Sequence, residues 1–203
     1  GVPGERDQQR HDQDERGRPE QDLHVEPERF EQTGEGVDEH VAVEIAVRTV
    51  HRHAAARIVR IDAIRQQRPD VPLVIVGWSL GGVIARQVAR QRPEVIADLI
   101  ALGAPLVGGP KYTFTAWWYA RKGMDLDSVE RKVAAYETAH PLPCPMLSIF
   151  TPHDGMVHPG ASFDPHHPGV VHREVDASHL GLVAAPEVLQ VVAERLAQRA
   201  PLS

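Results

Sequence analysis

Residues 77–82 read Gly-Trp-Ser-Leu-Gly-Gly, and the segments on either side of them decide the fold class. Residues 71–76, Val-Pro-Leu-Val-Ile-Val, form a continuous apolar run, which is typical of a strand buried on both faces of a parallel sheet. From residue 81 to 92, apolar side chains recur at helical spacing, with Arg86, Arg90 and Arg92 on the other side. We therefore expect a buried strand to run directly into a helix through these six residues.

The same alternation continues along the rest of the chain. Helices are expected at residues 54–68, 127–140 and 186–200, and strands at residues 99–102, 146–150 and 170–175. Residues 41–47 have an apolar pattern that fits either a strand or the first turns of a helix. Strands that alternate with helices predict an α/β fold, with a mostly parallel sheet that is covered by helices on both faces.

Composition supports one folded domain with a polar extension. The chain has 203 residues, of which 42% are hydrophobic, and this is enough apolar material for a single core. Residues 1–39 are rich in Glu, Asp, Arg and Gln and offer few side chains to bury, so they predict a disordered tail. We therefore expect residues 40–203 to form the folded domain.

Charge and hydropathy exclude several classes of partner. The net charge of −6, without a basic patch interleaved with aromatic residues, argues against a nucleic-acid partner. No apolar run reaches the ~20 residues of a membrane-spanning helix, and no signal-peptide pattern opens the chain. We expect a soluble protein without stable membrane insertion, with the cytoplasm as its default location. Cys144 is the single cysteine and cannot form an internal disulfide, and the oligomeric state stays open.

Ser79 lies where a nucleophilic serine would be expected. A serine hydroxyl reacts only when it is exposed, paired with a base and supplied with donors for the oxyanion. Glycines at 77 and 81 leave room for a tight strand-to-helix turn that lifts the serine above the sheet, and Gly82 allows close helix packing. The helix N-terminus directs the backbone N–H of Leu80 toward the same place. The position between a buried strand and an amphipathic helix therefore favours a nucleophile elbow over a chance Gly-x-Ser-x-Gly pattern.

A carboxylate and a histidine follow in the order that such a serine requires. Asp154 lies just past one expected strand, and His179 lies past the next strand and before the last helix. Asp164 and Asp176 are rival carboxylates, but neither directly follows a convincing strand. These positions predict that Asp154 and His179 meet above the sheet.

Five further histidines between residues 153 and 172 are candidate metal ligands. Their spacing matches no recognised pattern of metal ligands, so the sequence predicts no metal site and no cofactor. They are His153, His158, His166, His167 and His172.

Residues 54–200 resemble the α/β-hydrolase family, and in particular its lipase- and esterase-like members. The resemblance rests on three motifs: residues 77–82, residues 153–157 (His-Asp-Gly-Met-Val) and residues 178–182 (Ser-His-Leu-Gly-Leu). It implies an α/β-hydrolase domain over residues 40–203 that cleaves carboxylic esters through an acyl-enzyme, although thioesterases, peptidases and acyltransferases use the same residues. In that chemistry Ser79 is the nucleophile, His179 the general base and Asp154 the orienting acid.

The chain departs from this family before Ser79. Relatives carry early hydrophobic strands and a His-Gly segment that supplies a second oxyanion donor, and no His-Gly pair precedes Ser79 here. The resemblance therefore implies an N-terminal region that is truncated or altered. The alternative hypothesis is a non-catalytic or decayed α/β-hydrolase-fold protein with an incomplete oxyanion hole.

An insertion at about residues 106–143 corresponds to the cap that relatives carry over the active site. It holds a helix expected to begin at Asp127 or Ser128 and a concentration of aromatic residues, which either pack a core or line an apolar pocket. Trp117 and Trp118, together with Trp78 beside the serine, are the candidates for substrate contact. The expected partner is a small ester or lipid-like molecule.

Overall fold

The computed structural model describes residues 39–198, and for residues 39–48 it describes the backbone alone. All of these residues belong to one compact unit. The tail predicted for residues 1–39 lies outside the described residues, except for Glu39, which begins the first described helix. None of the described helices combines the length and apolar character that crossing a membrane requires.

The centre of the fold is a parallel sheet of four strands. In chain order the strands are β1 (Leu73–Trp78), β2 (Ile96–Leu102), β3 (Met146–Phe150) and β4 (Val170–Glu174). Their order in the sheet is the same, and every neighbouring pair is parallel. Because the carboxyl ends of parallel strands share one edge, the residues that follow these strands gather there.

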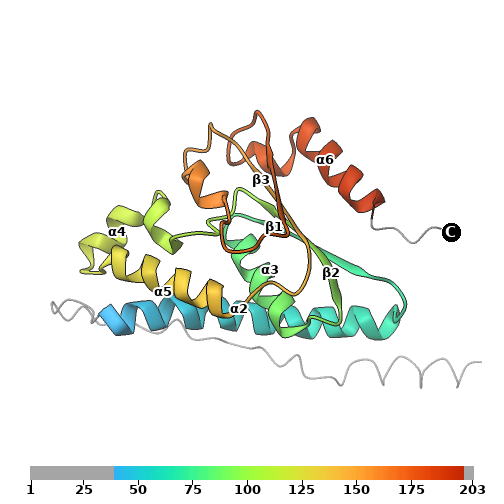
Figure 1. Cartoon of the computed structure of the whole chain (residues 1–203), viewed down its shortest axis with the longest axis horizontal. Coiled ribbons are helices and arrows are strands. Elements are labelled where there is room, and N and C mark those ends of the chain that lie inside the picture. Colours follow the sequence, from blue (N-terminus) through green and yellow to red (C-terminus); the bar gives the residue numbers. More distant parts are fainter. Residues whose placement is uncertain (1–38, 199–203) are drawn as a thin grey trace, which may run out of the picture. The chain divides into compact units, whose positions relative to one another are not determined.

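Helices cover both faces of the sheet, as the alternating pattern predicted. Figure 1 shows α2 (Glu39–Gln67) and α3 (Leu80–Gln91) on one side of the strands and α6 (Pro186–Ala197) on the other. Alternate residues of β2 divide between two cores: Leu99 packs with residues of α2 and α3, whereas Ile100 packs with Val188 of α6. The predicted α/β fold is confirmed.

The connection from β2 to β3 is more ordered than the sequence suggested. It contains the 3₁₀ helix η1 (Gly109–Tyr112), α4 (Ala116–Arg121) and α5 (Leu126–Ala139). Two further 3₁₀ turns, η2 (Pro159–Ser162) and η3 (Gly181–Val183), flank β4. Helix α5 begins at Leu126, one or two residues earlier than expected, because Asp125, and not Asp127 or Ser128, is its N-cap and accepts hydrogen bonds from the backbone N–H groups of those two residues.

Two other expectations need correction near the start of the domain. The ambiguous residues 41–47 belong to helix α2, which therefore begins well before residue 54. Strand β1 is not buried on both faces, since Val76 is 46% and Trp78 is 37% exposed. In the described sheet β1 is an edge strand that pairs with β2 alone, so its side chains have packing partners on one lateral side.

Candidate active site

Ser79 lies in a strained turn between β1 and α3. Its φ of 53° makes it the one non-glycine residue with positive φ among residues 39–198. Its N–H donates to the carbonyl of Leu102 at the end of β2, at 2.8 Å, and its own carbonyl accepts from the N–H of Gly82 at 3.0 Å. Such a conformation costs about 1–3 kcal/mol and is most often found at functional sites.

The three neighbouring glycines do not share one role. A Cβ at Gly77 would lie 2.5 Å from the carbonyl oxygen of Gly81, and a Cβ at Gly82 would lie 2.5 Å from Cβ of Ala104. The close packing expected of Gly82 is therefore confirmed, and Gly77 is required by the turn. Gly81 faces open space, so the expected steric need for a second flanking glycine is wrong.

Asp154 and His179 form a buried hydrogen-bonded pair. Nδ1 of His179 lies 2.7 Å from Oδ2 of Asp154, and the two side chains are 3% and 2% exposed. The other carboxylate oxygen accepts from the backbone N–H groups of Met156 and Val157 at 2.9 and 2.8 Å. Because an ionised carboxylate can only accept, Nδ1 carries the proton of this bond. The neutral ring then keeps Nε2 as its basic nitrogen.

The structure brings Asp154 and His179 together but does not join them to Ser79 by a hydrogen bond. Nε2 of His179 is buried and has no hydrogen-bond partner in the part of the chain that is described. A free basic nitrogen of this kind can take a proton from a hydroxyl that approaches it. Asp154 thus orients the imidazole through Nδ1, and Nε2 is available to accept a proton.

The three candidate substrate contacts lie in different environments. Trp78 contacts His179: its indole N–H donates to the backbone carbonyl of His179 at 3.0 Å, and the two rings lie 5.1 Å apart. Trp117 and Trp118 lie on α4, where they are 65% and 47% exposed. The structure therefore brings Trp78 to the His–Asp pair and leaves the other two at the surface.

Gly103 is a site residue that the sequence analysis missed. It directly follows β2, has a φ of +53°, and a Cβ there would lie 3.0 Å from Oδ2 of Asp154 and 3.2 Å from Nδ1 of His179. The same Cβ would lie only 2.6 Å from Cδ1 of Leu182. The available signal was a glycine at the carboxyl end of a strand, the edge of the sheet where the other site residues gather.

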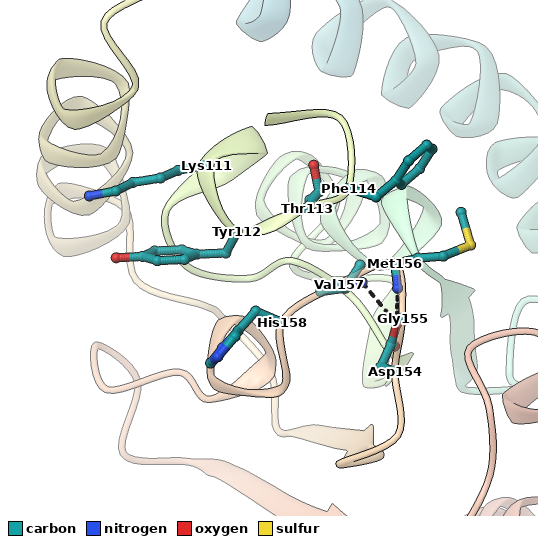
Figure 2. Close-up of a pocket in the computed structure, with 9 residues that line it drawn as sticks. All are labelled: Lys111, Tyr112, Thr113, Phe114, Asp154, Gly155, Met156, Val157 and His158. Carbon is teal, nitrogen blue, oxygen red and sulfur yellow. Dashed lines mark hydrogen bonds between the residues drawn. The ribbon is translucent and has the colours of Figure 1, made fainter. Parts of the chain in front are cut away.

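A hollow of about 320 Å³ lies between η1 and the loop that carries Asp154. Figure 2 shows its residues, with the carboxylate of Asp154 accepting from the backbone of its own loop. The lining residues are Lys111, Tyr112, Thr113, Phe114, Asp154, Gly155, Met156, Val157 and His158.

Backbone hydrogen bonds join the two walls of this hollow. The N–H of Phe114 donates to the carbonyl of Met156 at 2.7 Å, and the N–H of His158 donates to the carbonyl of Tyr112 at 2.8 Å. On the outer side, hydrogen bonds to Asp127 and Glu130 raise the pKa of Lys111. The loop that holds Asp154 is thus tied to the segment that precedes α4.

A buried ionic cluster anchors α5 and the segment after η2 to helix α3. Arg86 of α3, which is 2% exposed, is paired with Glu137 of α5 and lies 2.8 Å from Asp164. Nδ1 of His167 lies 2.8 Å from the same oxygen of Asp164, and Arg90 also pairs with Glu137. The sequence did not predict this cluster, because arginines along one side of a helix are usually exposed to solvent.

Burial and ion pairing shift the pKa values of this cluster in opposing ways. Burial lowers the pKa of Arg86, while the charges of Glu137 and Asp164 act against the shift. Burial acts to raise the pKa of Asp164, but the charge of Arg86 and a hydrogen bond from His167 outweigh it and hold that pKa below its usual value. Arg86 and Asp164 are therefore a true ion pair at neutral pH.

A family model and several curated proteins match parts of this chain. The family model described as alpha/beta hydrolase fold matches residues 18–141. Similar curated proteins include the monoglyceride lipase of Mus musculus, 29% identical over 72 residues, which are 36% of this chain and 22% of the lipase. Another is the pimeloyl-[acyl-carrier protein] methyl ester esterase of Aromatoleum aromaticum, 37% identical over 60 residues, which are 29% of this chain and 24% of the esterase. Each match spans under a quarter of the relative's own length.

Similar solved structures include an alpha/beta hydrolase enzyme from the metagenome of lagoon sediments at Mar Chica, Morocco. Its TM-score is 0.49 at 18% identity, with 72% of this chain and 70% of that chain covered. A thermophilic esterase has a TM-score of 0.49 at 16% identity, with 73% of each chain covered.

Proposed function

Because the chain belongs to the α/β-hydrolase fold family, we propose that it is a serine hydrolase that cleaves carboxylic esters through an acyl-enzyme on Ser79. One observation carries the proposal: the buried 2.7 Å contact between His179 and Asp154, with His179 also hydrogen-bonded to Trp78, which directly precedes the strained Ser79. A histidine with one nitrogen held by a carboxylate and the other free is suited to general base catalysis.

The first half of the proposed reaction forms the acyl-enzyme. Oγ of Ser79 attacks the ester carbonyl carbon while Nε2 of His179 takes the hydroxyl proton. Asp154 stabilises the resulting imidazolium through Nδ1. The tetrahedral intermediate then expels the alcohol, whose oxygen receives the proton from Nε2. The acyl group is left as an ester on Ser79.

The second half repeats these steps with water. Nε2 of His179 takes a proton from a water molecule, whose oxygen attacks the acyl carbon. The bond to Oγ breaks, Oγ regains the proton, and the carboxylic acid leaves. Each transfer returns His179 to its neutral form, so one ester and one water yield one acid and one alcohol.

The first helical N–H groups of α3 are the proposed site of oxyanion stabilisation. Leu80 is the first residue of α3, where backbone N–H groups lack an acceptor within the helix. A negative charge that develops beside Ser79 would be stabilised by this N–H and by the positive end of the helix dipole. Leu80 is accordingly proposed as one oxyanion donor.

The proposed substrate is a small ester or a lipid-like ester. Support comes from the names of two curated relatives, a monoglyceride lipase and a methyl ester esterase. The hollow beside Asp154, with Tyr112, Phe114 and Met156 in its lining, offers apolar surface of the kind that acyl chains contact. The exposed Trp117 and Trp118 of α4 remain proposed contacts for the outer part of such a molecule.

A fluorophosphonate probe tests the proposal directly. The wild-type protein should be labelled and should hydrolyse short p-nitrophenyl esters, and Ser79→Ala should abolish both. Ser128→Ala, which removes a serine on α5, is the matched control and should keep the label. Labelling that survives Ser79→Ala would contradict the assignment of the nucleophile.

A second candidate is a non-catalytic protein with the same fold. It is favoured by a separate observation, that no His-Gly pair precedes Ser79 to supply a second oxyanion donor. This candidate predicts a folded wild-type protein that shows neither a probe adduct nor ester turnover. Robust hydrolysis that is lost in Ser79→Ala would exclude it.

A further inference from the structure

We infer that Trp78 is a positioning residue, whose indole N–H ties the histidine loop (residues 176–182) to the residue that precedes Ser79. The inference rests on the proposed function, because it concerns how Ser79 and His179 are held for reaction. It gives Trp78 a different role from the substrate contact that the sequence suggested.

The contact joins two positions that are far apart in the chain. Nε1 of Trp78 donates to the backbone carbonyl of His179 at 3.0 Å across 101 residues. The two rings also lie 5.1 Å apart at an interplanar angle of 40°. An indole has one donor and no acceptor, so this hydrogen bond commits the polar group of Trp78 to the histidine loop.

The peptide bond between Trp78 and Ser79 makes this contact relevant to the nucleophile. Trp78 is the last residue of β1, where it pairs with Leu102 of β2. The N–H of Ser79 donates to the carbonyl of the same Leu102 at 2.8 Å. The backbone on both sides of the Trp78–Ser79 peptide is therefore fixed to the sheet. The hydrogen bond from the indole connects His179 to this fixed backbone.

His179 is held by two hydrogen bonds and lies close to a third element at Gly103. Trp78 of β1 holds its carbonyl, and Asp154 of the loop after β3 holds Nδ1 at 2.7 Å. Gly103, after β2, has no side chain at a place where a Cβ would lie 3.2 Å from Nδ1. Nε2 is the ring nitrogen that has no hydrogen-bond partner among residues 39–198. Loss of the indole contact should thus affect where Nε2 points.

A positioning role and a substrate-binding role predict different kinetic changes. Removing a group that binds substrate equally in the ground state and the transition state raises KM and leaves kcat unchanged. Removing a group that orients the general base lowers kcat, because the proton transfer is misaligned in the transition state. The two roles can therefore be separated by steady-state kinetics.

Trp78→Phe removes the donor and keeps an aromatic ring. We expect kcat to fall about five- to tenfold, the change that loss of one neutral hydrogen bond produces, with KM within twofold of wild type. Replacement of Trp78 by benzothienylalanine, which exchanges the N–H for sulfur in a ring of nearly the same shape, should give the same loss of kcat. A raised KM with unchanged kcat in both variants would overturn the inference.

Proton exchange at the indoles tests the contact without any enzyme assay. The chain has three tryptophans, and the other two are 65% and 47% exposed on α4. In ¹H–¹⁵N spectra the indole N–H of Trp78, identified by its absence in Trp78→Phe, should exchange with water more slowly than those of Trp117 and Trp118. Equally fast exchange at all three would overturn the inference even in an active enzyme.

A third measurement separates this inference from the proposed function. If wild type shows no ester turnover, the proposed function fails, and the inference is judged from the ring nitrogen signals of His179. Trp78→Phe should shift or broaden these signals, and Trp118→Phe should leave them unchanged. Unchanged His179 signals in Trp78→Phe would overturn the inference.

Discussion

Gly103 lies directly against His179, so that a Cβ at position 103 would be 3.2 Å from Nδ1 of the histidine. The same atom would be 3.0 Å from Oδ2 of Asp154, and the φ of Gly103 is +53°. A side chain here must therefore push against the His–Asp pair while the backbone is strained. Among the described glycines, this one links local backbone conformation to the geometry of the proposed base.

Gly103→Ala should lower both activity and stability. A displacement of the proposed catalytic pair by about 1 Å is expected to reduce kcat by about 100-fold. The positive φ should cost about 1–3 kcal/mol of unfolding free energy. Ester hydrolysis assays and urea unfolding would measure the two effects.

Gly169→Ala is the matched control for this change, since a Cβ at Gly169 would meet no atom within 4 Å. It should change kcat by less than about twofold, because an unhindered surface substitution has little effect. Wild-type kcat in Gly103→Ala would show that the histidine does not depend on the space at residue 103.

Asp154→Asn should nearly abolish turnover while KM changes little. An asparagine amide cannot stabilise an imidazolium, and its NH₂ can donate to Nδ1, which moves the ring proton to Nε2. By analogy with other serine triads, kcat should fall by roughly 10⁴-fold. The rate of labelling by a fluorophosphonate probe should fall in parallel.

Asp176→Asn provides the comparison, because Asp176 was a rival carboxylate in the sequence. Its side chain is 89% exposed and lies 3.6 Å from His153, whereas the carboxylate at Nδ1 of His179 is that of Asp154. We expect its kcat to stay within about twofold of wild type, as for most exposed substitutions. A larger loss in Asp176→Asn than in Asp154→Asn would reverse the assignment of the acid.

The sequence predicted those parts of the fold and site that depend on local patterns. The strand at residues 146–150 was placed at its observed bounds because a short apolar run follows two prolines. The turn at Ser79 is predictable because the strand, the glycine-rich turn and the helix follow one another directly in the sequence. Asp154 and His179 were chosen by their place after strands, and the structure pairs them.

Features that depend on distant partners could not be predicted. Arg86 looked like the polar side of α3, yet it is buried because Glu137 and Asp164, which are 51 and 78 residues away, reach it. Gly103 has no local peculiarity that distinguishes it from a turn glycine. The sequence also could not predict that β1 is partly exposed. An apolar run does not reveal how many strands lie beside it, and β1 has a neighbour on one side only in the described sheet.

Arg86→Met should destabilise the protein by about 3–5 kcal/mol, the usual cost of leaving a buried charge without its partner. Glu137 and Asp164 would both lose their contact with the guanidinium. Arg92→Met is the matched control, because Arg92 and Asp62 form an ion pair that is about one-third exposed. Its effect should be much smaller, because solvent screens an exposed ion pair. Similar losses in the two variants, measured by urea unfolding, would contradict the importance of burial.

The last prediction concerns pH and the buried face of His172. Burial lowers the pKa of His172 below its ordinary value of 6.5, although the charge of Asp164 acts in the opposite direction. Nε2 of His172 accepts a hydrogen bond from the backbone N–H of Asp164 at 3.0 Å, and its ring stacks on Phe163. The hydrogen bond needs the neutral ring, because a protonated Nε2 cannot accept.

The sign of the effect follows from proton binding in the two states. Between the lowered pKa and 6.5 the unfolded chain binds a proton at His172 and the folded chain does not, so stability falls as pH falls. His172→Gln keeps an acceptor for Asp164 and does not titrate. The loss of unfolding free energy between pH 7 and pH 5.5 should therefore be smaller in His172→Gln than in wild type. The same pH dependence in His172→Gln and wild type, measured by urea unfolding, would show that His172 does not contribute.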